Sequence, residues 1–371
     1  MKKILLHVGT HKTGSTSIQQ TLFNNRDILK ANNIHYLEFG SNHWHIYSAF
    51  MNNPWDWFEH KRMGRDKESV QELNAATLCD VKAEVMSSEC DNILISSEYL
   101  AQLQKRKIYS LRNYLQKLGD VTVIYYCREL ISWISSDSQQ CAKVGMKNEP
   151  TKYEVAIKRM YDFPLNYIEV FGIENFRLIR FEDAIQGGLC NSLLSRGNLP
   201  KIEEMGISES SDNASISTEA VNAFFILNRI HPLFGDTRSH KTTQMLKAMP
   251  GRKYRVNLLT KAQAADCNRK MRYLSRKYKF PMYDKVRCET GENDRQTFGD
   301  ESMAYLLDQL NKLNLEPRGL IKKAKALKKE ANSALEEGKE AEARGDSAAA
   351  IELYRKALES FAGLRLRKFK Q

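Results

Sequence analysis

The chain has 371 residues, of which 42% are hydrophobic and 27% are charged, and its formal net charge is +12. This length and composition indicate a globular protein with one large core and room for a small appended unit. No apolar run approaches the roughly 20 residues that a membrane-spanning helix needs. The basic residues are spread along the chain, without the aromatic-interleaved patches of a nucleic-acid-binding module. We therefore expect no transmembrane segment and no specific nucleic-acid partner.

The first residues, M-K-K-I-L-L-H-V, begin like a signal peptide, but their apolar stretch is short and runs directly into a glycine-rich loop. This pattern favours a cytoplasmic location. The seven cysteines form no C-x-x-C pair and have no regular spacing. We therefore expect reduced thiols, with neither a zinc site nor a disulfide scaffold.

A short apolar strand is predicted at residues 4–8, and the glycine-rich loop follows it as G-T-H-K-T-G-S. Gly9 and Gly14 have the G-x-x-x-x-G spacing of a phosphate-binding loop, but Ser15 stands where an ATP- or GTP-binding loop has its lysine. The lysine lies inside the loop, at Lys12. Backbone N–H groups at residues 14–16, where a helix is predicted to begin, would still bind an anion, because a helix N-terminus has unpaired donors and partial positive charge.

A second segment, V-T-V-I-Y-Y-C at residues 121–127, is a β-branched and aromatic run of the buried-strand type. It ends at Arg128, and an amphipathic stretch from Glu129 to Val144 follows. Ser136 lies eight positions after the arginine, which is about two turns of a helix.

Together, the loop with its following helix and the Arg128 segment resemble the sulfotransferase family, in particular its bacterial branch that acts on carbohydrates and other small acceptors. In that family the loop binds the 5′-phosphosulfate of 3′-phosphoadenosine 5′-phosphosulfate (PAPS), and the arginine and serine bind its 3′-phosphate. No metal is required, and 3′-phosphoadenosine 5′-phosphate (PAP) is the product. The chain departs from the family at Glu129 and Leu130, where many members have Asp-Pro. The resemblance implies donor contacts from Thr10, His11, Lys12, Thr13, Gly14, Ser15, Thr16, Ser17, Arg128 and Ser136.

Further buried strands are predicted at residues 92–97 and 176–181, in alternation with helical stretches. This order predicts an α/β fold, a P-loop-type parallel sheet flanked by helices. Ligands of such sheets bind at the carboxyl ends of strands. Lys12, Glu98 and Arg128 all lie at or just past such ends, so we expect them in one site.

The pattern is helical and irregular from about residue 217, and we expect a sulfotransferase domain at 1–318 followed by a helical tail at 319–371. Within the tail, residues 343–359 resemble the second half of a tetratricopeptide repeat, with Gly345, Ala350, Tyr354 and Ala357 at the small and aromatic positions. Because repeats of this kind stabilise one another, a single hairpin must pack on the catalytic domain or on another chain, or remain marginal. The tail therefore predicts a protein partner or self-association.

In the expected reaction, Lys12 would contact the leaving group, and a base would take the proton of the acceptor. Glu98 is one candidate base, since partial burial raises the pKa of a carboxyl. His45 is the other, since an unshifted imidazole is a competent base near neutral pH. The aromatic residues between Trp44 and Phe58 belong either to the core or to a platform for a sugar acceptor.

The sequence thus predicts a PAPS-dependent sulfotransferase acting on a hydroxyl or amine of a glycan or small molecule. One alternative is a P-loop nucleotide kinase or NTPase with Glu98 near a magnesium ion, although the loop lacks the lysine after Gly14. The other is a non-catalytic interaction protein built around the tetratricopeptide-like tail.

Overall fold

The computed structural model divides the chain into two units, one made of residues 1–134, 152–213 and 258–288 and the other of residues 135–151, 214–257 and 289–371. The structure describes residues 1–146, 151–210, 215–230, 240–256, 259–283, 285–288, 302, 305, 318–350, 352–354 and 356–357.

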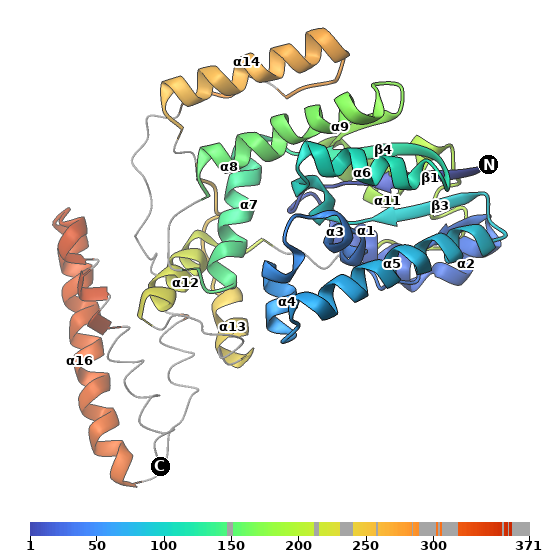
Figure 1. Ribbon diagram of the computed structural model, residues 1–371. Helices are drawn as coiled ribbons and strands as arrows, with labels where there is room; N and C mark the ends of the chain where they lie inside the picture. Colours follow the sequence, from blue (N-terminus) through green and yellow to red (C-terminus); the bar gives the residue numbers. More distant parts are fainter. Residues whose placement is uncertain are drawn as a thin grey trace. The chain divides into compact units, whose positions relative to one another are not determined.

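The first unit is built on a parallel sheet of five strands with the order β2-β3-β1-β4-β5 (Figure 1). The strands are β1 (Lys2–His7), β2 (Ile34–Tyr36), β3 (Asn92–Ser96), β4 (Gly119–Cys127) and β5 (Phe176–Arg180). The predicted α/β class is confirmed, and four of the strands lie where the sequence indicates them. The prediction missed β2, because three residues are too few for a recognisable alternation.

Helices cover both faces of the sheet, because successive strand residues point to opposite sides. Ile4 and Leu6 of β1 belong to one core cluster, whereas Leu5 between them belongs to the other. The first cluster is completed by α3 (Trp44–Phe50), α5 (Lys67–Ser87), α6 (Lys105–Leu115) and α9 (Phe163–Phe171). The second is completed by α1 (Ser15–Asn24), α2 (Arg26–Ala31), α10 (Phe181–Gly187) and α11 (Leu189–Leu194).

The first unit contains several further elements. They are the 3₁₀ turns at Pro54–Asp56, Glu98–Gln102 and Ser195–Gly197, the helices α4 (Phe58–Arg62) and α8 (Tyr153–Ile157), a π-helical turn at Lys158–Asp162, and α14 (Lys261–Tyr278). After α14, Phe280 and Tyr283 pack against the first core cluster. This segment lies in a stretch where the sequence pattern predicts no element.

Helix α7 (Leu130–Lys143) follows β4 and carries the chain from the first unit into the second. The second unit contains α12 (Thr218–Ile230), α13 (His240–Lys247) and α16 (Arg318–Ala343). The Ser217 hydroxyl accepts a hydrogen bond from the backbone N–H of Ala220 at 3.0 Å and so caps the start of α12. This agrees with the helical region predicted from about residue 217.

In the tail, helix α16 is followed by a turn and by further helical residues. The chain turns after α16 at Gly345, where φ is 78°, and helical residues follow from Ser347. A Cβ atom on Gly338 would lie only 2.6 Å from the Tyr354 ring, so this glycine lets the two arms approach closely. The Tyr354 hydroxyl donates to the Glu342 carboxylate at 2.8 Å. The tetratricopeptide likeness and the boundary at 318/319 stay predictions.

Among the helices that the structure describes, none is both long and apolar enough to cross a membrane. The seven cysteines are all free thiols, as the sequence pattern indicates.

Candidate active site

The order of the strands brings the two predicted phosphate motifs to the same edge of the sheet. Strand β1 is the central strand, and β4 is its neighbour. Along the strand order, the connection from β1 leads toward β2 at one edge of the sheet, and the connection from β4 leads toward β5 at the opposite edge. In open α/β sheets ligands bind where connections part in this way. The loop after β1 and Arg128 after β4 occupy this place.

Both glycines of the loop are required by close contacts. A Cβ atom on Gly9 would lie 2.5 Å from the His7 ring, and one on Gly14 would lie 2.5 Å from the side chain of Leu189. Gly14 also has a φ of 79° and caps the start of α1. Only glycine adopts that conformation without strain. The spacing read from the sequence therefore corresponds to two positions where a Cβ atom would crowd a neighbouring side chain.

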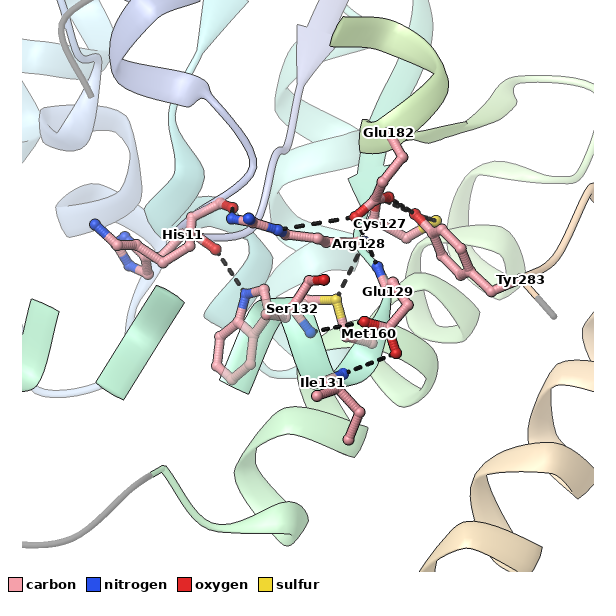
Figure 2. Close-up of polar contacts among 11 residues, drawn as sticks. His11, Cys127, Arg128, Glu129, Ile131, Ser132, Met160, Glu182 and Tyr283 are labelled. Atoms are coloured by element: carbon pink, nitrogen blue, oxygen red, sulfur yellow. Dashed lines mark hydrogen bonds and ion pairs between the residues drawn. The ribbon is translucent and has the colours of Figure 1, made fainter. Parts of the chain in front are cut away.

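Two donors from the segment that follows β4 fix the crown of the loop. Trp133 Nε1 donates to the carbonyl oxygen of His11, and Arg128 Nη1 donates to that of Lys12, both at 2.7 Å (Figure 2). Lys12 itself has a φ of 68°, a left-handed conformation that is costly for a residue with a side chain. Such a conformation persists where its surroundings hold it. Left-handed residues within a turn form the backbone nests that bind anions.

One hydroxyl of the loop lacks a protein partner. Thr10 is 1% exposed, and its Oγ1 has no hydrogen-bond partner among the described residues. A buried unpaired hydroxyl is unusual in a protein, and an oxygen of a bound anion would satisfy it. Thr13, by contrast, donates its hydroxyl to the Thr10 carbonyl at 2.6 Å. The Ser17 hydroxyl donates to the Ser210 carbonyl, so its expected contact with a donor stays a prediction.

Arg128 lies at the end of β4 in a network of polar contacts (Figure 2). Its guanidinium lies over the Phe181 ring at 4.7 Å, and its Nε is 3.9 Å from Glu182 Oε1. Burial lowers the pKa of Arg128, and the charge of Glu182 opposes that effect. Ser136, its expected partner, is a half-buried residue of α7 in the second unit, so their joint contact with a phosphate stays a prediction.

Glu98 is a buried carboxyl at the end of β3, with 9% of its surface exposed. Its Oε2 accepts hydrogen bonds from Gln19 Nε2 at 2.7 Å and Asn42 Nδ2 at 2.9 Å. Its Oε1 is 3.7 Å from Nδ1 of His11 in the loop crown. Burial raises the pKa of Glu98, although the two amide donors and the charge of Lys12 act in the opposite direction.

The His11 ring joins Glu98 to the crown of the loop. Burial, together with the charges of Arg159 and Lys12, lowers the pKa of His11 to about 3, so the ring is neutral near pH 7. Its Nε2 lies 2.9 Å from Gln102 Nε2. The low pKa makes the ring a weak base, and the expected contact of His11 with a donor stays a prediction.

His45 differs from the expectation of an unshifted imidazole. Burial, with the charges of Arg65 and His60, lowers its pKa to about 4, which makes the ring a weaker base than an ordinary histidine. The ring stacks on Trp44 at 3.6 Å, and its Nδ1 has no hydrogen-bond partner among the described residues.

Part of the aromatic cluster lies beside the crown. The Tyr99 ring makes edge contacts with His11 at 4.9 Å and with Trp57 at 5.1 Å, and Tyr47 stacks on Tyr99 at 5.7 Å. Phe50, in contrast, is buried in the core. Tyr47 is buried in the same core cluster, so a platform for a sugar acceptor stays a prediction.

Three residues of the site have no signal in the sequence. Arg159 lies on the π-helical turn, with its guanidinium 5.5 Å from the Trp133 ring, and π-helical turns recur at functional sites. Glu182 and Tyr283 surround Arg128 and come from two distant segments (Figure 2). Nothing in the local pattern marks Arg159 or Tyr283.

No family model and no curated protein matches the chain. Among solved structures, the crystal structure of a sulfotransferase from Alicyclobacillus acidocaldarius is similar to it, with a TM-score of 0.34 and 14% sequence identity. The match covers 66% of this chain and 99% of that chain. A score of 0.34 is too low to establish a common fold, so this likeness decides neither fold nor function.

Proposed function

We propose that the chain is a sulfotransferase that transfers the sulfuryl group of PAPS to a hydroxyl or amine of an acceptor and releases PAP. The observation that carries the proposal is the hydrogen bond between Arg128 and the Lys12 carbonyl. It joins two motifs that lie 116 positions apart in the chain, so one site can bind two separated phosphate groups. The displaced loop lysine distinguishes this site from that of a kinase.

The reaction balances without oxidant or reductant. The bond between sulfur and the bridging oxygen of the 5′-phosphate breaks, and a bond between sulfur and the acceptor oxygen or nitrogen forms. The acceptor loses one proton, and the 5′-phosphate of PAP takes the electron pair of the broken bond. The Lys12 ammonium would stabilise the charge that develops on that phosphate, which is the usual electrostatic contribution of an active-site cation.

Glu98 is the better candidate for the base. Its pKa is raised by burial, whereas that of His45 is lowered to about 4, so the carboxylate is a stronger base than usual and the imidazole a weaker one. Its Oε1 faces His11 in the crown, where the sulfuryl group of a bound donor would lie. The same contacts also fit a carboxylate that only positions His11, so turnover must distinguish the two roles.

The acceptor is proposed to be a carbohydrate or another small molecule with a flat apolar face. Tyr99 and Trp57 extend from the crown as aromatic surfaces of the kind that stack on sugar rings. A cytoplasmic location and a protein partner for the tail hairpin belong to the same proposal.

Calorimetry with PAP, AMP and ATP tests the function. We expect PAP to bind on the order of 10²-fold more tightly than AMP, because only PAP has a 3′-phosphate for a buried, charge-assisted contact with Arg128. Adding magnesium should not change the affinity for PAP. Equal affinities for PAP and AMP, or tight ATP binding that depends on magnesium, would contradict the proposal.

A further inference from the structure

The Arg128 guanidinium is held on three sides by the first unit. The backbone carbonyl oxygen of Lys12 accepts a hydrogen bond from Nη1, and the guanidinium lies over the Phe181 ring. Oε1 of Glu182 lies 3.9 Å from Nε. A guanidinium has five N–H donors in a planar arrangement. These contacts therefore fix its plane and leave donors for a phosphate.

The carboxylate that faces Arg128 is itself fixed. Tyr283 donates its hydroxyl to Glu182 Oε2 at 2.6 Å, and the backbone N–H of Glu129 approaches Oε1 at 3.3 Å (Figure 2). The tyrosine hydroxyl also lies 2.9 Å from the Cys127 carbonyl oxygen, directly before the arginine. Each oxygen of Glu182 thus has a partner, and the carboxylate cannot turn away from Arg128 without losing a hydrogen bond.

Tyr283 stays protonated, so it acts as a donor in this network. Burial raises its pKa above the ordinary value, and the neighbouring Cys127 and Glu182 add to that effect. Its ring is covered on one side by the guanidinium of Arg180 at 4.6 Å. The hydroxyl and the ring therefore have separate contacts, and a phenylalanine would keep the second while losing the first.

An arginine that has to find its orientation at the moment of binding loses side-chain entropy. Residues that fix the orientation beforehand reduce that loss and strengthen binding. The effect concerns only ligands that use the arginine. A nucleotide without a 3′-phosphate gains nothing from it.

We propose that Glu182 and Tyr283 are positioning residues that hold Arg128 ready for the 3′-phosphate and so set the preference for PAP over AMP. The proposal rests on the proposed function. It assigns a role in nucleotide selectivity to Glu182, which faces the arginine, and to Tyr283, which holds Glu182 in place.

The test measures the dissociation constants of PAP and AMP by calorimetry for the natural chain, Tyr283→Phe and Glu182→Gln. Both variants should bind PAP about three- to tenfold more weakly, as expected for residues coupled to a binding group, with AMP affinity changed by less than about twofold. Tyr167→Phe is the matched control, because it also loses a buried tyrosine hydrogen bond, to the Leu100 carbonyl at 2.7 Å, away from Arg128.

A double-mutant cycle shows whether the effect passes through the arginine. In an Arg128→Ala background, Tyr283→Phe should cause no further loss of PAP affinity. An additional loss of the same size as in the natural chain would overturn the proposal. If Glu182→Gln fails to fold, Tyr283→Phe alone tests the positioning role, because this variant keeps the aromatic ring packed against Arg180.

Failure of this inference is distinguishable from failure of the proposed function. A natural chain that does not prefer PAP over AMP would overturn both. A natural chain that prefers PAP, with the same preference in both variants, would overturn the positioning role alone.

Discussion

At the scale of single residues, Lys12 has the most direct expected effect on chemistry. Lys12→Met should lower kcat by about 10²-fold or more, in the range found when a charge-stabilising donor is lost, while PAP affinity changes little. The reason is that the negative charge on the 5′-phosphate, which the ammonium stabilises, develops fully only when the bond to sulfur breaks. Turnover with radiolabelled PAPS across an acceptor panel measures the effect.

An exposed lysine of α5, Lys82, provides the control, and Lys82→Met should leave turnover unchanged. A change confined to KM in Lys12→Met would mean that this lysine contributes only to ground-state binding.

The two candidate bases differ in their expected pH dependence. A carboxylate base must be ionised, so activity of the natural chain should rise with pH through the pKa of Glu98, which burial places above its ordinary value. Glu98→Gln should remove this rise of activity with pH and lower kcat by about 10²-fold or more. His45→Gln should keep most of the activity, since its pKa of about 4 makes it a weak base.

PAP affinity measured beside turnover separates loss of a base from loss of structure, because Glu98 also accepts from Gln19 and Asn42. If both variants turn over at nearly the natural rate, neither residue is the base.

At the scale of elements, the junction of the loop with α1 depends on Gly14. Gly14→Ala and Gly40→Ala both place alanine at a positive φ, which costs about 1–2 kcal/mol. Only the first also forces a Cβ atom against Leu189, since nothing lies within 4 Å of a Cβ atom on Gly40. We therefore expect Gly14→Ala to weaken PAP binding by about tenfold or more, and Gly40→Ala to leave it unchanged.

Calorimetry for binding, together with urea unfolding for stability, compares this matched pair. Equal losses of PAP affinity would show that the contact with Leu189 does not control the loop.

At the scale of the whole molecule, the tail should be separable from donor binding. The loop, Glu98 and Arg128 belong to the first unit, whereas residues 319–371 belong to the second. A chain that ends at residue 318 should therefore bind PAP with its full affinity, and its oligomeric state or solubility should change instead. Calorimetry and light scattering measure the two properties. Loss of PAP binding in a truncated chain that circular dichroism shows to be folded would assign the tail to the active site.

Buried histidines should make the fold sensitive to acid. Burial lowers the pKa values of His7, His11 and His43 to about 3, so the unfolded chain binds more protons than the folded chain between about pH 3 and 6.5. Stability should then fall as the pH drops below 6.5, by up to about 1.4 kcal/mol per pH unit for each histidine. Glu98 acts in the opposite direction. Because its pKa is raised in the folded chain, the folded chain binds a proton there more readily than the unfolded chain, and this contribution to stability increases as the pH falls.

Urea unfolding between pH 7 and pH 5 measures this slope. His43 accepts a hydrogen bond from the Ser96 N–H on Nδ1, a contact that only the unprotonated nitrogen can make. His43→Gln should therefore reduce the slope by about one proton, and an unchanged slope would contradict the assignment.

Local patterns in the sequence predicted most of the strands and marked the glycine-rich loop. Short segments rich in apolar, β-branched and aromatic residues predicted four of the five strands. The glycine spacing marked two positions where a Cβ atom would crowd a neighbouring side chain. These features depend on neighbours in the sequence, so composition and spacing reveal them. The three residues of β2 are too short for such a signal.

The surroundings of each charged group were decided only by tertiary structure. The sequence placed Lys12, Glu98 and Arg128 at strand ends, but the partners that hold Arg128 include Tyr283, which lies more than 150 positions away in the chain. The pKa of His45 likewise depends on burial and on Arg65, which is why the expected unshifted imidazole was wrong. Burial and contacts between distant segments arise only when the chain is folded, and they leave no period or spacing in the sequence from which they could be predicted.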